Sequence, residues 1–434
     1  RRTRVVLLMS QCYSGGFATL GSRGATDDRN VCGYFSTTAD RLAYGCYPED
    51  RGRDGVGHAF AFFRALERSG SFPEAHAETL VTDRTPDVPF TTSDMFLERL
   101  LEQAAERADE SVASLGDRLL DEARGDGGRT CGKSSDDLLL RMSRGFGEPV
   151  PASLRELDER LARVRRATEA LGVYTKAWEA AVGDANRASL DRFLRERPEW
   201  KVRLESDDLD FLTTRAAFLP ALTAFSREHS KSHERILALG KGFRDARALR
   251  HRMEVREAAL LRMRMRLLSI AGEAYLSTMA SPAEREAYEG LRSCESLRLG
   301  RPTEGSADRR EIPPFPQAEE DWALLETVRT PRIGIDHEPA DPEEFFQGAA
   351  AVRRITPGSP AERAGLRIGD VILGPPGDPF TERNELRGWL KLVPIGEPVS
   401  LEVDRKEKRI VVTVEPEDAA PSGERSTRRS PTRR

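Results

Sequence analysis

The sequence lacks any apolar run close to the ~20 residues that a membrane-spanning helix requires. It also lacks an excess of either charge, because its 434 residues carry 68 Lys and Arg against 72 Asp and Glu, a formal net charge of -4. We therefore predict no membrane span and no nucleic-acid partner. Its length suggests three domains of about 150 residues each.

Metal-binding spacings are also missing. None of the five cysteines forms the Cys-x-x-Cys pair typical of structural zinc sites. His229 and His233 are four residues apart, but Ser230 stands where a zinc protease needs glutamate. We predict neither a metal site nor a cofactor. Pairing of Cys131 with Cys294 is left open, and such a disulfide would indicate an envelope or extracellular protein.

One complete motif lacks its structural context. Residues 127–134 read GGRTCGKS and match the phosphate-binding pattern G-x-x-x-x-G-K-[ST]. Such a loop needs a buried strand before it, so that the following helix points its amino terminus at the phosphates. Residues 115–124 instead have the apolar spacing of an amphipathic helix. We therefore predict no nucleotide binding.

The stretch that organises the chain is residues 5–17, VVLLMSQCYSGGF. Its first five residues form a short apolar run that predicts a strand buried on both faces of a parallel sheet. Cys12 follows the carboxyl end, where open α/β sheets place their ligands, and Gly15 and Gly16 allow backbone to approach a substrate. The pattern predicts a thiolate nucleophile. The alternative is a buried core cysteine.

Three ordered blocks resemble the caspase-like clan of cysteine peptidases, and they look closest to bacterial members of the legumain branch. The blocks are residues 12–17, residues 35–40 continued by 44–46, and a predicted helix at 57–66. The resemblance implies part of an α/β sheet and a cysteine-type endopeptidase. Such an enzyme cleaves peptide or protein substrates through a Cys/His dyad.

The resemblance also assigns roles to residues around Cys12. It implies an oxyanion-binding turn at Ser14, Gly15 and Gly16, and a substrate pocket at Ser10, Ser36, Thr37, Thr38 and Asp40. The family places an acidic residue where this chain has Ser10. A preference for Arg or Lys at the cleavage site therefore loses its main electrostatic source, which Asp40 could replace in part.

The histidine of the dyad has no counterpart in the sequence. In caspases it lies roughly 50 residues upstream of the cysteine, whereas only residues 1–11 precede Cys12. We therefore expect a fragment of a longer protein that is inactive by itself. His58 is predicted to be a packed helix residue and His76 a surface loop residue, so neither is expected to be the base.

Residues 153–300 are predicted to be all helical, as a long antiparallel hairpin resembling a coiled coil or as a partly open bundle. Capping-box spacings at Ser153 and Ser281 mark two helix starts. The arginine-rich residues 262–268 have acidic neighbours and no aromatic side chains for base stacking. They are therefore predicted to be a solvated helix face and not a nucleic-acid interface.

Short β-branched runs separated by Gly and Pro follow residue 325. Residues 357–361 and 369–372 resemble a PDZ domain of the bacterial periplasmic-protease type. The resemblance implies that a protein carboxyl terminus pairs with a strand edge. It assigns the carboxylate to Ile333, Gly334 and Ile335, and the apolar groove to Leu386 and Leu390. The alternative is a groove that packs against the helical region.

The predicted architecture is multidomain: part of an α/β peptidase sheet, a central all-α hairpin and a β-rich PDZ domain. The predicted boundaries are 1–124 for the peptidase part, 125–152 for a glycine-rich linker, 153–300 for the helices, 301–325 for a second linker, 326–416 for the PDZ domain and 417–434 for a disordered basic tail. The predicted function is a cysteine endopeptidase of the periplasm, cell envelope or exterior. The alternative is a non-catalytic scaffold with a degenerate peptidase fold.

Overall fold

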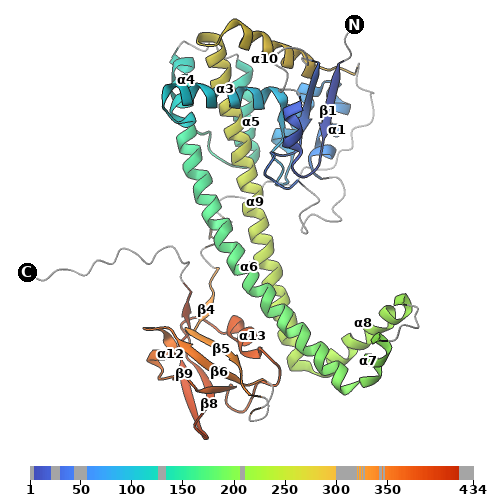
Figure 1. Cartoon of the computed structure of the whole chain (residues 1–434), viewed down its shortest axis with the longest axis vertical. Helices are drawn as coiled ribbons and strands as arrows, with labels where there is room; N and C mark the ends of the chain where they lie inside the picture. The colour runs from blue at the N-terminus through green and yellow to red at the C-terminus, as the bar shows by residue number, and fades with distance from the viewer. Residues whose placement is uncertain are drawn as a thin grey trace, which may run out of the picture. The chain divides into compact units, whose positions relative to one another are not determined.

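A computed structural model describes residues 4–20, 30–43, 56–125, 133–205, 211–299, 320, 322–323, 325, 328–341, 345 and 348–419 (Figure 1). The chain divides into two compact units, residues 1–169 with 249–323 and residues 170–248 with 324–434. Within the described ranges, no helix is both long and apolar enough to span a membrane.

The first unit contains a sheet with the strand order β1-β2-β3. β1 (Val5–Met9) lies parallel to β2 (Val31–Phe35), and β3 (Phe90–Thr91) is antiparallel to β2. The predicted strand and its parallel pairing are therefore confirmed. The prediction of burial on both faces is wrong, because β1 is an edge strand among the described residues, with Val5 exposed and the other four half-buried.

Within the described ranges, two helices lie between β2 and β3 in the chain, and three follow β3 directly. They are α1 (His58–Ser69), α2 (Phe72–Thr82), α3 (Thr92–Ala108), α4 (Val112–Gly125) and α5 (Lys133–Phe146). Their order confirms the helix predicted after β2 and the amphipathic helix at 115–124. The linker predicted at 125–152 is wrong over α5, because Leu139, Met142 and Phe146 give this segment a buried apolar face.

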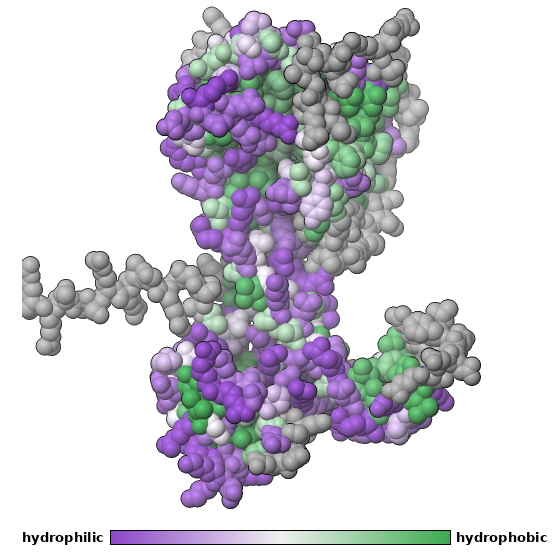
Figure 2. Space-filling view, in the orientation of Figure 1, coloured by the Kyte–Doolittle hydropathy of each residue, from purple (hydrophilic) through white to green (hydrophobic). Residues whose placement is uncertain are grey.

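The central region is a pair of long helices, α6 (Leu154–Glu196) and α9 (Ser230–Thr278), joined by α7 (Pro198–Glu205) and α8 (Phe211–Glu228). In the first unit, the beginning of α6 packs its leucines against the end of α9. In the second unit, Trp178 of α6 packs against Gly242 of α9, where an added Cβ would lie 2.3 Å from the indole ring. The predicted helical region is confirmed, and of its two predicted arrangements the antiparallel hairpin is formed. Its visible surface is mainly hydrophilic (Figure 2).

The two predicted helix caps form differently. At Ser281 the complete capping box is present, followed by α10 (Pro282–Glu295). Ser153 Oγ accepts the Glu156 N–H at 3.0 Å, but the Glu156 carboxylate accepts from Ala152 N–H and not from Ser153. Both side chains therefore mark the start of a helix, as predicted.

A disulfide joins α10 to the sheet. Cys294 is bonded to Cys32 of β2, with the two Cα atoms 6.0 Å apart, and the Tyr34 hydroxyl donates to the Glu295 carbonyl at 2.8 Å. The pairing of Cys294 with Cys131 that the sequence left open is therefore not formed, because the end of α10 packs beside β2. Cys131 itself lies outside the described residues.

The arginine-rich segment is not a solvated face throughout. Arg262 is 1% exposed, and its guanidinium donates four hydrogen bonds of 2.6 to 3.0 Å to the carbonyls of Asp83, Thr85 and Asp87. The surface prediction is wrong at Arg262, because α9 passes beside the loop at 83–87, whose buried carbonyls require donors. Arg264 fits the prediction better, since it is partly exposed and pairs with Asp158 at 2.6 Å.

The second unit contains a five-stranded antiparallel sheet in the order β5-β6-β7-β8-β9. Its strands are β5 (Ile335–Pro339), β6 (Ala350–Ile355), β7 (Val371–Gly374), β8 (Val399–Arg405) and β9 (Lys408–Val414), and its helices are α12 (Pro360–Arg363) and α13 (Glu385–Leu392). This confirms the predicted β-rich C-terminal domain.

A two-stranded ladder accompanies this sheet. β4 (Pro331–Arg332) pairs with β10 (Glu417–Asp418), so the first residues of the predicted disordered tail are ordered, because they close this ladder. Residues 420–434 lie outside the described residues, as does most of the predicted linker at 301–325. Within that linker, Trp322 stacks on Arg163 with the guanidinium carbon 4.2 Å from the ring centroid.

Candidate functional site

The carboxyl end of β1 brings together two of the predicted site segments. The Thr37 N–H donates to Ser14 Oγ, and Ser14 Oγ contacts the Thr37 carbonyl and Ser36 Oγ, each at 3.2 Å. The Gly15 N–H donates to the Thr37 carbonyl at 2.9 Å, and an added Cβ on Gly15 would lie 2.7 Å from Ala39 N. Glycine is therefore required for this close approach of the two segments.

Burial changes the roles predicted for several of these residues. Ser14, Ser36 and Thr37 are fully buried, so they hold the turn together and present no side chain to a substrate. Asp40 is exposed and accepts a hydrogen bond from the half-buried Thr38 at 2.6 Å. Of the other predicted site residues, Ser10, Gly16 and Asp40 are exposed and Thr38 is half-buried.

Cys12 differs most from its prediction. It is half-buried and disulfide-bonded, and its sulfur accepts the Ala43 N–H at 3.4 Å. A disulfide sulfur has no proton to lose, so in this state Cys12 is neither the predicted thiolate nor a free core cysteine. Tyr13, the next residue, has a φ of 61°, a left-handed conformation that non-glycine residues adopt rarely.

Ser10 and His58 are hydrogen-bonded, and the pair resembles a serine nucleophile with its histidine base. Ser10 Oγ lies 2.7 Å from His58 Nδ1. However, burial, together with the smaller effects of nearby His76 and Arg262, lowers the pKa of His58 to about 3. Within the described structure His58 Nε2 has no hydrogen-bond partner that could stabilise an imidazolium. His58 is therefore a packed histidine, as predicted, and is unsuited to general-base catalysis.

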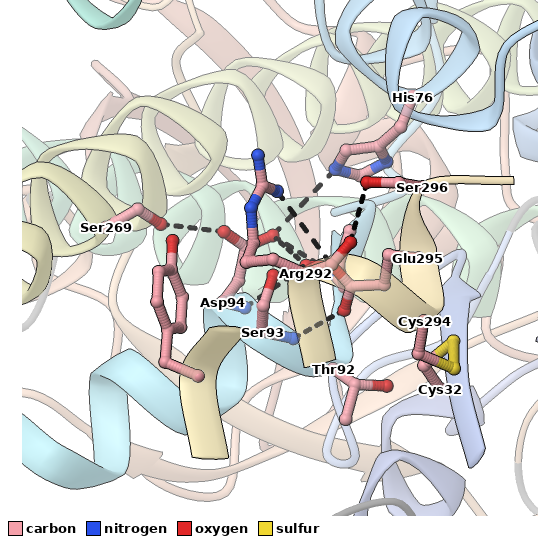
Figure 3. A network of polar contacts seen from close by, with 12 residues as sticks. Cys32, His76, Thr92, Ser93, Asp94, Ser269, Arg292, Cys294, Glu295 and Ser296 are labelled. Carbon is pink, nitrogen blue, oxygen red and sulfur yellow. Dashed lines mark hydrogen bonds and ion pairs between the residues drawn. A yellow bond between two sulfur atoms is a disulfide. The ribbon is translucent and has the colours of Figure 1, made fainter. Parts of the chain in front are cut away.

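A buried polar network links α10 to the start of α3 (Figure 3). The Glu295 carboxylate accepts the Ser93 N–H at 2.7 Å and the Ser93 hydroxyl at 2.6 Å. Ser269 Oγ donates to Asp94 at 2.7 Å, and His76 Nε2 lies 3.9 Å from Asp94. The prediction that His76 is a surface loop residue is wrong, because it lies in α2 and is buried.

Burial also shifts the pKa values of two groups in this network. It raises the pKa of Glu295 to about 7, although the hydrogen bonds from Ser93 oppose the shift. It lowers the pKa of His76, a shift that nearby Asp94 opposes. These groups lie inside the protein and hold separate elements together. Among the described residues, no group of His, Cys, Asp and Glu side chains has the arrangement of a metal site.

The second candidate site is the edge of the C-terminal sheet at Gly334. The Ile333 carbonyl accepts the Ala361 N–H and the Gly334 carbonyl accepts the Thr356 N–H, both at 2.8 Å. A trans peptide places each N–H opposite the preceding carbonyl, so the N–H groups of Gly334 and Ile335 point away from 356–361. Gly334 has a φ of 80°, and an added Cβ would lie 2.2 Å from Ser359 Cβ. Only glycine fits this turn.

The strand after this turn, β5, is the edge of its sheet and pairs with β6 alone among the described residues. Helix α13 lies alongside, because Leu386 and Leu390 share one apolar cluster with Ile335. The sequence predicts that Leu386 lines a surface groove, but this side chain is 0% exposed and therefore belongs to the core. Leu390 is half-buried, which places it where the helix meets the surface.

Comparison with known proteins identifies this region. The PDZ domain family matches residues 331–415. The "Putative serine protease HhoA" of Synechocystis sp. (strain ATCC 27184 / PCC 6803 / Kazusa) is 36% identical over 64 residues, which are 15% of this chain and 16% of that protein. Residues 331–415 are therefore a PDZ domain. The chain matches only about a sixth of that relative's length.

Solved structures give similar partial matches. The HtrA-type protease AlgW with a decapeptide is 20% identical, and the match covers 24% of this chain and 36% of that one with a TM-score of 0.21. The HtrA3 PDZ domain bound to a phage-derived ligand (FGRWV) is 26% identical, covering 21% of this chain and 88% of that one with a TM-score of 0.19. The curated relative is named as a serine protease, so these matches do not support the resemblance to cysteine peptidases.

Proposed function

We propose that the PDZ domain of this chain binds the carboxyl-terminal residues of peptides or proteins. The observation that carries the proposal is the edge strand β5, which directly follows the turn at Gly334. An extended peptide would pair with this edge, and the N–H groups of Gly334 and Ile335 would receive its carboxylate. Ile335 and Leu390 would contact an apolar terminal side chain.

The test compares matched peptides ending in valine, one with a free carboxyl end and one amidated, titrated into the full chain. Removal of the charge is expected to weaken binding by about 1.5 to 3 kcal/mol, the range for hydrogen bonds to charged groups. That corresponds to a loss of roughly ten- to more than a hundredfold in affinity. Equal affinities for the two peptides would contradict the proposal.

A pair of glycine variants localises the binding. Gly334→Ala is expected to abolish it, because the new Cβ would collide with Ser359. Gly358→Ala is the matched control, since Gly358 also has a positive φ of 71° but has nothing within 4 Å of an added Cβ. Retention of the PDZ fold in both variants is checked by circular dichroism.

A second candidate is cysteine-dependent peptide hydrolysis at Cys12. It is favoured by the place of Cys12 after β1 and by the left-handed Tyr13 beside it. An external dithiol would first have to reduce the Cys12 disulfide, becoming oxidised as the thiol is released. His58 and His76 are both buried with lowered pKa values, so neither supplies the base.

We therefore expect no peptide turnover by this chain, with or without dithiothreitol. Cleavage that requires dithiothreitol and disappears in Cys12→Ala would establish the second candidate. Without such cleavage, peptide capture makes the chain a binding scaffold, which is the alternative that the sequence left open.

We further infer an oxidising location, such as the periplasm, cell envelope or exterior. Two observations support it: the disulfide between Cys32 and Cys294, and the disulfide-bonded state of Cys12. Alkylation of the protein isolated from its source, followed by mass spectrometry, should find these three cysteines unmodified unless the protein is first reduced.

A further inference from the structure

We propose that Arg387 of the PDZ helix α13 selects peptides with an acidic side chain upstream of their carboxyl end. We also propose that Asp184 of α6 occupies Arg387 when such a peptide is absent. The proposal deepens the peptide-binding function above and rests on it.

The first support is the position of Arg387 relative to β5. Side chains alternate along a strand, so His337 lies on the same face as Ile335, which packs toward α13. Burial lowers the pKa of His337, and the positive charge of Arg387 lowers it further. Arg387 directly follows Leu386 in α13, and Leu386 and Leu390 pack in one cluster with Ile335 of β5, so Arg387 lies beside the strand that a peptide would join.

The next charged residue after Arg387 on α13 is also basic. Lys391 lies one helical turn after Arg387, and its pKa is lowered by burial and then by Arg387. Two positive charges that are close together and partly buried favour the binding of a carboxylate between them. The acidic residues Asp336 and Glu338 lie on the other face of β5, where they pair with arginines of β6.

The second support is that a carboxylate already contacts Arg387. Its Nη1 lies 2.9 Å from Asp184 Oδ2, and the other oxygen of Asp184 accepts from Arg187 at 2.6 Å. The Asp184 side chain is 9% exposed, whereas that of Arg387 is 47% exposed. The guanidinium is therefore accessible to the carboxylate of a peptide side chain, which would compete with Asp184 for it.

The contact at Arg387 can be separated from the other contacts between hairpin and PDZ domain. Arg235 of α9 pairs with Glu385, and Leu239 lies 3.3 Å from the position of an added Cβ on Gly388. These contacts involve other positions of α13 and do not use Arg387. Loss of Asp184 should therefore free Arg387 while α13 stays against the hairpin.

The test measures affinities of the full chain for free-acid peptides that end in valine. One series carries Glu, and a matched series carries Gln, at each of the four positions before the terminal residue. Wild type is expected to prefer Glu at one of these positions by about three- to tenfold, a modest effect because Arg387 is half-exposed. Arg387→Gln should abolish this preference.

The role of Asp184 is tested with Asp184→Asn. This variant should bind the preferred Glu peptide about three- to tenfold more tightly and the Gln peptide as before. Arg235→Gln is the matched control, because it removes an ion pair between hairpin and α13 without touching Arg387. It should leave the preference for Glu unchanged.

The outcomes distinguish failure of the selection by Arg387 from failure of the peptide-binding function itself. If free-acid peptides bind but Glu and Gln series have equal affinities at every position, the selection by Arg387 is overturned. If Asp184→Asn strengthens both series equally, Asp184 covers the groove in general and does not compete at Arg387. If no free-acid peptide binds more tightly than its amide, the proposed function itself fails.

Discussion

Replacing Arg262 by methionine should destabilise the first unit strongly. The side chains have similar lengths, so the change removes the four guanidinium hydrogen bonds to the loop at 83–87 without a large cavity. Asp83, Thr85 and Asp87, whose carbonyls accept these bonds, are each at most 3% exposed, so water does not replace the lost donors without an opening of the loop.

The magnitude follows from these contacts. A buried acceptor left without a donor costs about 1 to 3 kcal/mol, and three carbonyls are affected. Part of this loss is offset, because a buried guanidinium itself carries a desolvation cost, seen in the lowered pKa of Arg262. We expect a net loss of about 3 to 5 kcal/mol in the free energy of unfolding.

The assay is urea unfolding of the full chain followed by circular dichroism, together with hydrogen exchange of the amides near residues 83–87. Arg264→Met is the matched control two residues away, and its partly exposed ion pair with Asp158 should contribute no more than about 1 kcal/mol. The reasoning is refuted if Arg262→Met costs no more than Arg264→Met, or if exchange near 83–87 is unchanged.

Three further predictions concern the same unit. Leu268→Ala should lower the free energy of unfolding by about 2 to 5 kcal/mol because Leu268 is 2% exposed. Leu261 is half-buried, so Leu261→Ala should lower it by less. Changes near zero for both variants would mean that the apolar contact between α6 and α9 is misassigned. Replacing Cys32 and Cys294 together by alanine should lower stability by about 2 to 5 kcal/mol in thermal unfolding, and an unchanged midpoint would show that the bond constrains nothing. Glu295 has a pKa of about 7, above its ordinary 4.5, so the stability it contributes below pH 4.5 is lost as the pH rises through 7. The loss in free energy of unfolding caused by Glu295→Gln should therefore become smaller by up to about 3 kcal/mol between pH 4.5 and pH 7. A loss independent of pH would contradict the raised pKa of this buried carboxyl group.

Features encoded locally could be predicted from the sequence. The strand at Val5–Met9 follows from its apolar run, and the start of α10 follows from Ser281 and its capping partner. The PDZ domain was also recognisable, because its turns need glycine at fixed positions, such as Gly334 with its positive φ. Helix α5 lies in a segment that the sequence predicts as a linker, because its neighbouring glycines favour a loop although Leu139, Met142 and Phe146 have helical spacing.

Features that depend on distant segments could not be predicted. Arg262 reads as a surface arginine until α9 is placed beside the loop at 83–87, which lies more than 170 residues earlier. His76 reads as a loop residue until α2 packs toward Asp94. Asp184 and Arg387 are 203 residues apart in the sequence, and no sequence motif indicates their contact. Such pairs are set by which elements meet in the fold and not by local spacing.

The disulfide between Cys32 and Cys294 also has a consequence for biosynthesis. The two cysteines are 262 positions apart, and both long helices lie between them. At typical elongation rates of about 5 to 20 residues per second, Cys32 waits on the order of ten to fifty seconds for its partner to be made. During that interval its thiol can react with a cysteine synthesised earlier, such as Cys12. We therefore expect correct maturation to depend on disulfide exchange by an isomerase.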